Sequence, residues 1–418
     1  MFKPNKDGKY VFPPSHFTSI FLPSTAEVAR LLQLPENIPQ QITFFERVHE
    51  IDSKIAKSSK ANILTQGVSL RTLTKLYNFG ENISVSFKIF FTTANLLKLL
   101  RPAKAGSNAG DWFALGLGIS TVKNDNELFT LGDWLISRSE ADYLMLKTIK
   151  KQIKIGEIDK NDYITIWQAL LPTWQHYSLV PPEQLAYYTS YLNASDALKS
   201  PSDEPNQRLY EAVYHMIFDF FLTAIAHYEV GLYQYYQRKF DTFEPYGETI
   251  LFSKVMHTFT SPDVKCSCYE AVLIELKRFL SSGKTELSWR AMAAFIPIKD
   301  SAKDSADIQA DGKNAQQESQ STERLIDRQY HQLKDWRNGE NLPSYAKLEA
   351  FVTALFNLHG NFDVQAVLNY FRIARAIDIK INECVKLTPD IQIASIREKV
   401  LARYLTYFEH YRAALIKK

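Results

Sequence analysis

The chain has 418 residues, of which 45% are hydrophobic and 13% aromatic, and its formal net charge at pH 7 is +3. This apolar content excludes a chain that is disordered as a whole, and the length favours two or more domains over a single core. Only 15 Gly and 17 Pro interrupt the sequence, which favours long helices over many short strands.

Three cysteines, Cys266, Cys268 and Cys384, are too few and too unevenly spaced for a disulfide framework, so a reducing compartment fits best. The N-terminus lacks the continuous apolar stretch of a signal peptide. The most apolar segment, residues 83–100, contains Lys88 and Lys98 and does not have the composition of a spanning helix. We therefore expect a cytoplasmic protein without a membrane partner.

We interpret residues 1–105 as an N-terminal helical region. Its helical patterns cover residues 25–32, 41–58, 69–77 and 85–100. Between residues 54 and 104 there are nine basic residues and only one acidic residue. Such a run is typical of a solvated face and can also contact phosphates. The Gly- and Ala-rich residues 102–118 that follow are expected to form a boundary or a surface loop.

Residues 106–262 are interpreted as a central helical region with helices over 131–155, from Pro181-Pro182 onward, and over 206–240. The last carries polar residues every fourth position: Glu211, His215, Asp219, Thr223 and His227. Such a stripe can supply metal ligands, but no second helix offers matching ones. We therefore interpret it as a solvated face or a capped core, and we predict no metal and no cofactor.

Residues 263–360 contain four helical patterns, over 269–280, 288–295 with Ser288 as N-cap, 323–338 and 344–356. Between the second and third lies a polar segment, 300–322, in which Ile308 is the only large apolar residue. It cannot bury enough surface to offset the entropy of ordering, so we expect it to be disordered.

The end of the third pattern is the most informative stretch of the chain. It reads Gln-Leu-Lys-Asp-Trp-Arg-Asn-Gly-Glu-Asn-Leu-Pro-Ser over residues 332–344, a helix end, a Gly stop and a Pro-Ser start of the next helix. This stretch resembles the end of the recognition helix in helix-turn-helix repressors of the Cro and lambda-repressor type. The resemblance implies an all-α, repressor-like module, here interrupted by the 300–322 segment.

The resemblance also implies a set of DNA-contacting residues, placed by their distance from Gly339. Base-facing candidates are Gln329, Tyr330, His331 and Lys334. Phosphate candidates are Arg328, Arg337, Asn338 and Asn341. Twelve bases and thirteen acids lie between residues 269 and 360, so the module itself carries almost no net charge.

Residues 361–418 predict a C-terminal helical pair over 364–386 and 390–415. The second helix has an apolar face, which packs either on the core or on a second subunit, and in the second case these helices form a homodimer. The face comprises Ile396, Val400, Tyr404, Phe408, Tyr411 and Leu415.

The fold predicted from these patterns is all-α, with several helical subdomains. The sequence favours a regulator or accessory factor that binds double-stranded DNA. The alternative is a helical protein-interaction protein in which the helix-turn-helix is only a structural unit. No catalytic constellation is found, and an enzyme is not expected.

Overall fold

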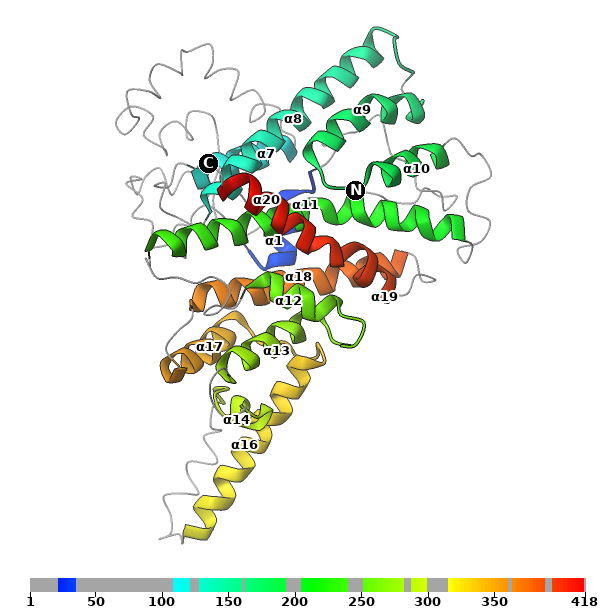
Figure 1. Ribbon diagram of the computed structural model, residues 1–418. Coiled ribbons are helices and arrows are strands. Elements are labelled where there is room, and N and C mark those ends of the chain that lie inside the picture. Colours follow the sequence, from blue (N-terminus) through cyan, green and yellow to red (C-terminus); the bar gives the residue numbers. More distant parts are fainter. Residues whose placement is uncertain are drawn as a thin grey trace, which may run out of the picture. The chain divides into compact units, whose positions relative to one another are not determined.

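A computed structural model describes residues 22–34, 108–120, 128–159, 162–192, 204–239, 251–281, 287–298, 315–359, 363–387 and 393–416. Within these ranges the chain forms helices and no strand, which confirms the all-α prediction (Figure 1). Two compact units divide the chain, unit 1 with Met1–Asp241 and Asn382–Lys418, and unit 2 with Thr242–Ile381. The division does not follow the four predicted regions, because the end of the chain packs with helices far away in the sequence.

Unit 1 contains both helices that the periodicity predicted and helices that it did not predict. They are α1 (Thr25–Leu32), α7 (Asn108–Ser120), α8 (Phe129–Lys154), α9 (Tyr163–Tyr177), α10 (Pro182–Leu192), α11 (Glu204–Lys239), α19 (Ile393–Ser395) and α20 (Tyr404–Ile416). The predicted helices at 25–32, 131–155 and 206–240 and the start at Pro181-Pro182 are confirmed. The patterns at 41–58, 69–77 and 85–100, with the basic run 54–104, lie outside the described residues.

The prediction of a boundary or loop over residues 102–118 is wrong for residues 108–118, because α7 begins at Asn108 and includes Gly110, Gly116 and Gly118. Residues 102–107 lie outside the described part. Glycine is needed where α7 meets α8. A Cβ built on Gly116 would lie 2.9 Å from the Gly132 carbonyl oxygen and 2.9 Å from the Leu135 Cβ. The low glycine helix propensity is therefore outweighed by close helix packing.

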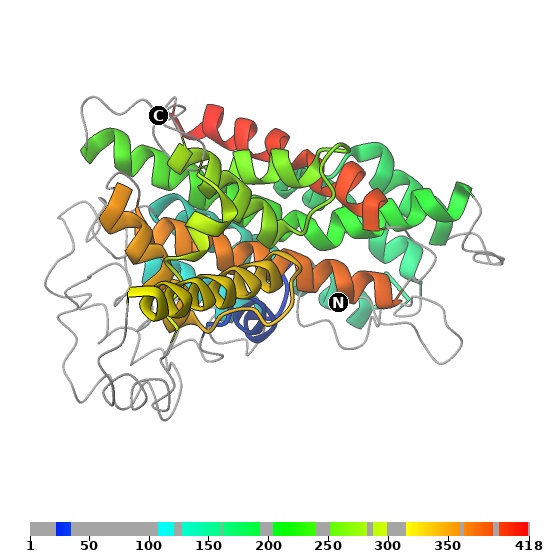
Figure 2. The ribbon, with the colours of Figure 1, turned by 90° about the horizontal axis from the view of Figure 1, so that it is seen from below.

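Helix α11 is the centre of unit 1 and contacts α8, α10 and α20. Figures 1 and 2 show α20 lying along α11. The segment Arg208–Arg238 has the length and composition of a membrane-spanning helix, but 72% of its most apolar window is buried in the protein. A core helix passes the same test, so this segment is weak evidence for a membrane.

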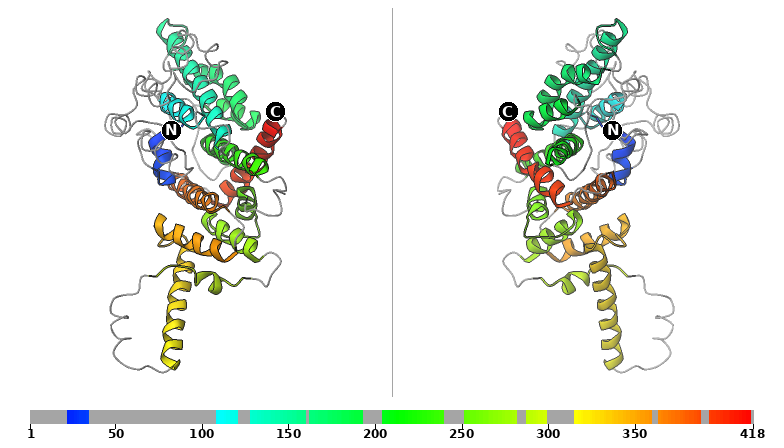
Figure 3. Two further views of the ribbon diagram at one scale, coloured as in Figure 1. Left: turned by 90° about the vertical axis from the view of Figure 1, so that its left-hand side faces the viewer. Right: turned by 90° about the vertical axis from the view of Figure 1, so that its right-hand side faces the viewer.

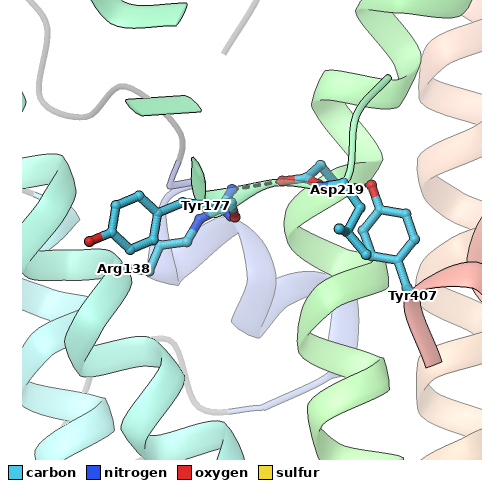
Figure 4. A network of polar contacts seen from close by, with 5 residues as sticks. Arg138, Tyr177, Asp219 and Tyr407 are labelled. Carbon is cyan, nitrogen blue, oxygen red and sulfur yellow. Dashed lines mark hydrogen bonds and ion pairs between the residues drawn. The ribbon is translucent and has the colours of Figure 1, made fainter. Parts of the chain in front are cut away.

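A buried ion pair lies between α8 and α11 (Figure 4). The Arg138 guanidinium donates to Asp219 at 2.8 Å and also to the Tyr177 carbonyl oxygen, and both charged side chains are almost fully buried. Asp219 accepts further hydrogen bonds from the Tyr407 hydroxyl at 2.8 Å and from the Leu179 backbone N–H at 3.2 Å. Burial and the neighbouring Asp219 carboxylate raise the pKa of Tyr407, so its hydroxyl stays a donor.

Four of the five residues of the polar stripe of α11 belong to the core, whereas Glu211 is half-buried and forms an ion pair with the exposed Lys399. His215, Asp219, Thr223 and His227 are all buried. His215 contacts Gln184, and the His227 ring stacks on Trp134. Of the two interpretations of this stripe, the structure supports the core one. Among the described residues, no three His, Cys, Asp or Glu side chains come together as a metal site.

The last helical segment is not the single helix 390–415 that the sequence predicted. Between α19 and α20 the backbone widens into a π-helical turn, Ile396–Val400, and then tightens into a 3-10 turn, Leu401–Arg403. Ile396, Val400, Tyr404 and Phe408 are buried in unit 1. This part of the expected dimer face is therefore covered within a single chain.

Unit 2 is built from α12 (Phe252–Thr260), α13 (Cys268–Ser281), α14 (Trp289–Ala293), α16 (Ala315–Arg337), α17 (Tyr345–His359) and most of α18 (Val364–Leu387). All five helices predicted between residues 269 and 386 are present, although α14 ends two residues early. The prediction of disorder over 300–322 is wrong for residues 315–322, because α16 begins at Ala315. Residues 299–314 lie outside the described part.

We predict that Arg138→Met lowers the free energy of unfolding by about 3–5 kcal/mol, because it leaves the buried Asp219 carboxylate without its cation. Urea denaturation measures the loss. The matched control is Arg30→Met, whose ion pair with Glu383 is largely exposed and contributes about 0–1 kcal/mol. Equal losses of unfolding free energy in the two variants would contradict the conclusion that the buried ion pair matters more than the exposed one.

A second prediction concerns acid stability. Burial, with Arg403 nearby, lowers the pKa of His215 to about 4, and burial, with Arg138 nearby, lowers that of His227 to about 3. The ordinary value is about 6.5, so the unfolded chain binds more protons below that pH and stability is lost as pH falls from 6.5 towards 4. In His215→Gln/His227→Phe, denaturation measured across this window should show a shallower pH dependence. The control His176→Gln, at an exposed position, should leave the pH dependence of stability unchanged. If the double variant keeps the pH dependence of the unchanged protein, groups other than His215 and His227 cause it.

Candidate nucleic-acid interface

The N-terminus of α13 is capped by a carboxylate from α18. Asp378 accepts the backbone N–H groups of Cys268 and Tyr269, both at 2.9 Å, and the Ser267 hydroxyl oxygen accepts that of Glu270. Burial raises the pKa of Asp378 to about 6, although the two amide donors act to lower it. This cap fixes the first helix of the module through a residue more than 100 positions away in the sequence.

The C-terminal end of α16 is held by its backbone and by two large side chains. Glu340 N–H donates to the Asp335 carbonyl at 2.8 Å and Gly339 N–H to that of Trp336 at 3.1 Å, the bond pattern of a Schellman motif. Gly339 has φ of +75°, a left-handed conformation that favours glycine. Leu333 and Trp336 are completely buried, and Trp336 meets the Phe351 ring of α17 edge-on. The helix end predicted at Gly339 is thereby confirmed.

Gln329 does not face solvent, contrary to the position that the resemblance implied for it. Its side chain is 7% exposed, and its amide nitrogen donates to the carbonyl oxygens of Ala294 at 3.0 Å and Ile296 at 2.8 Å. These carbonyls follow the end of α14, where no helical N–H is available to them. Gln329 thus joins α14 to α16 and is not available to a base edge.

Arg337 also makes its contacts within the module. Its guanidinium forms an ion pair with Glu270 at 2.8 Å and lies 4.2 Å from the centre of the Trp289 ring. These contacts connect α16 to α13 and to the first residue of α14. Arg337 therefore acts in the structure as a packing residue, although the sequence placed it among the phosphate contacts.

The remaining candidates lie on the accessible side of α16 and in the turn after it. His331 and Lys334 are exposed, as is Arg328, whereas Tyr330 is half-buried. Asn338 and Asn341 are exposed beyond the helix end, and the Asn341 amide reaches Asp335 at 3.4 Å. Helical geometry places Arg328, His331 and Lys334 within about one third of the helix circumference, on the side opposite Leu333.

The charges around this surface are mixed. Asp327 lies on the same side of α16 and is paired with Arg290 of α14 at 2.7 Å, which leaves less negative charge beside Arg328. In unit 2, α16 extends well beyond α14 (Figure 3). Asp335, which is half-buried, also lies on this side of α16. The site is therefore a solvent-facing side of one helix on which the cations Arg328 and Lys334 alternate with acidic residues.

Comparison of the chain with protein-family models, curated proteins and solved structures finds no match. The site is therefore interpreted from its own geometry. Sequence reasoning did not identify Trp289 and Glu270 as the partners of Arg337, or Asp378 as a helix cap. Trp289 directly after an N-cap serine was a visible signal for a packed helix start. Nothing local marked Asp378, which lies within an ordinary amphipathic helix.

We predict that Gln329→Met lowers the free energy of unfolding by about 1–3 kcal/mol, because two backbone carbonyls lose their donor while the side-chain volume is preserved. Chemical denaturation followed by tryptophan fluorescence measures the loss. Gln332→Met on the same helix is the matched control, since Gln332 bonds only the partly exposed Lys347 ammonium. If the two variants lose the same stability, Gln329 is not the link between α14 and α16.

Proposed function

We propose that the protein is a DNA-binding regulator or accessory factor, and that helices α13, α14, α16 and α17 form a repressor-like helix-turn-helix module. The observation that carries the proposal is the accessible side of α16. There Arg328, His331 and Lys334 are exposed, while Leu333 and Trp336 anchor the opposite side in the core of the module. An exposed helix that is held rigidly by its neighbours is what insertion into a major groove requires.

Each exposed side chain has a chemistry suited to DNA. The Lys334 ammonium can donate to the guanine acceptors N7 and O6, and His331 can donate to or accept from base edges. Arg328 lies one turn from His331 and is suited to phosphate oxygens, which position a protein without specifying sequence. We therefore propose a base-contacting set of His331 and Lys334, without Gln329.

The proposal is tested by fluorescence anisotropy of the full-length protein with a labelled random-sequence duplex and with genomic fragments. We predict that Lys334→Ala/Arg328→Ala weakens binding by about 10-fold or more, because two cationic contacts are lost. Lys265→Ala, an exposed lysine of unit 2 outside α16, is the control and should bind like the unchanged protein.

Absence of binding even at low salt would remove the DNA proposal. The alternative would then stand, a helical interaction protein in which α13–α17 is only a structural unit. The observation that favours this alternative is the near-neutral charge of residues 269–360, because phosphate binding draws on positive charge. Cross-linking of the full-length protein to cellular proteins, with and without nuclease, separates the two functions.

A further inference from the structure

The C-terminal third of α8 carries an uninterrupted row of lysines. Lys147, Lys150, Lys151 and Lys154 are all exposed, and no acidic residue occurs between positions 143 and 156. Their spacing of three, one and three residues places them along one side of the helix. The opposite side of the same stretch is buried through Met145, Leu146 and Ile149, so the orientation of the row is fixed by the core of unit 1.

The four ammonium groups have no partner in the part of the chain that the structure describes. No hydrogen bond or ion pair reaches any of them, whereas Lys399 and Lys347 are each held by Glu211 and Gln332 respectively. The nearest acids along the chain are the buried Asp142 and the exposed Glu157, which lie beyond the two ends of the row. Four like charges on adjacent helical turns repel one another, and an anionic ligand would relieve that repulsion.

We propose that this lysine row (Lys147, Lys150, Lys151 and Lys154) is a phosphate-contacting surface for the backbone of double-stranded DNA. The inference rests on the proposed DNA-binding function and extends it to unit 1. The proposed function needs a source of sequence-independent affinity for DNA. Residues 269–360 supply little of it, because they carry twelve bases and thirteen acids. The lysine row supplies that affinity, while α16 supplies contacts to bases.

The dimensions and chemistry of the row fit a duplex. From Lys147 to Lys154 the helix rises about 10 Å, over which duplex DNA presents roughly six phosphates. Lysine is a flexible point charge suited to phosphates without bidentate geometry. The exposed apolar residues Leu144 and Ile155 stand at the two ends of the row, about 16 Å apart along the helix, and do not form one apolar patch for a protein partner.

The test measures the salt dependence of binding to a labelled random-sequence duplex by anisotropy. The variant Lys147→Gln/Lys150→Gln/Lys151→Gln/Lys154→Gln should reduce the slope of log K against log salt by about 3 to 4, since each phosphate contact contributes about 0.9. The same four positions changed to Arg should keep the slope. Lys265→Gln/Lys386→Gln, two exposed lysines outside the row, should bind like the unchanged protein. Far-UV circular dichroism and thermal unfolding check that each variant is folded.

The outcomes separate this inference from the proposed function. If the unchanged protein binds and the glutamine variant retains its affinity and slope, the lysine row is not a DNA contact, and the role of α16 stands on its own variants. If the glutamine variant loses the slope while Lys334→Ala/Arg328→Ala has no effect, the row is a DNA contact and α16 is not. If the unchanged protein binds an acidic protein through the lysine row and does not bind duplex DNA, the inference is overturned.

Discussion

The buried ion pair between Arg138 and Asp219 holds together three segments of unit 1. A carboxylate in an apolar core is tolerated only when charge and hydrogen bonds replace its hydration, and here a guanidinium, a hydroxyl and a backbone amide do so. These donors come from α8, from the segment after α9 and from α20. Helix α11 can therefore place Asp219 in the core only when all three segments are in position. A requirement of this kind specifies one arrangement of helices where apolar packing alone would permit several.

In unit 2, polar and charged side chains hold the ends of helices. Asp378 caps α13, Gln329 caps the end of α14, and Arg337 connects α16 to α13 and Trp289. Each contact satisfies backbone groups or charges at a helix terminus, where a short helix such as α14 has few bonds of its own. The result is a helix, α16, whose inner side is held at several points and whose outer side remains accessible. That asymmetry is the physical basis for the proposed contact with a groove.

The two surfaces proposed to contact DNA differ in charge. The module around α16 is nearly neutral, and Asp327, one of several accessible acids, is paired with Arg290. The lysine row on α8 has four cations and no described partner. Sequence-independent affinity scales with the number of neutralised phosphates, whereas discrimination depends on the placement of a few donors. A protein can therefore keep its base-contacting helix weakly charged when another surface supplies the affinity.

The positions of most described helices followed from the sequence, because helical periodicity and the Gly and Pro signals act within a few residues. Ser288 as N-cap, Gly339 as helix end and the long helix over 206–240 are examples. Which side of each helix is buried depended on partners distant in the sequence. Asp219 entered the core because Arg138 and Tyr407 meet it there, and Gln329 turned inward because the carbonyls after α14 lacked a donor. Gly116 lies within α7 at a point where α8 approaches too closely for a side chain, a contact that no local pattern encodes.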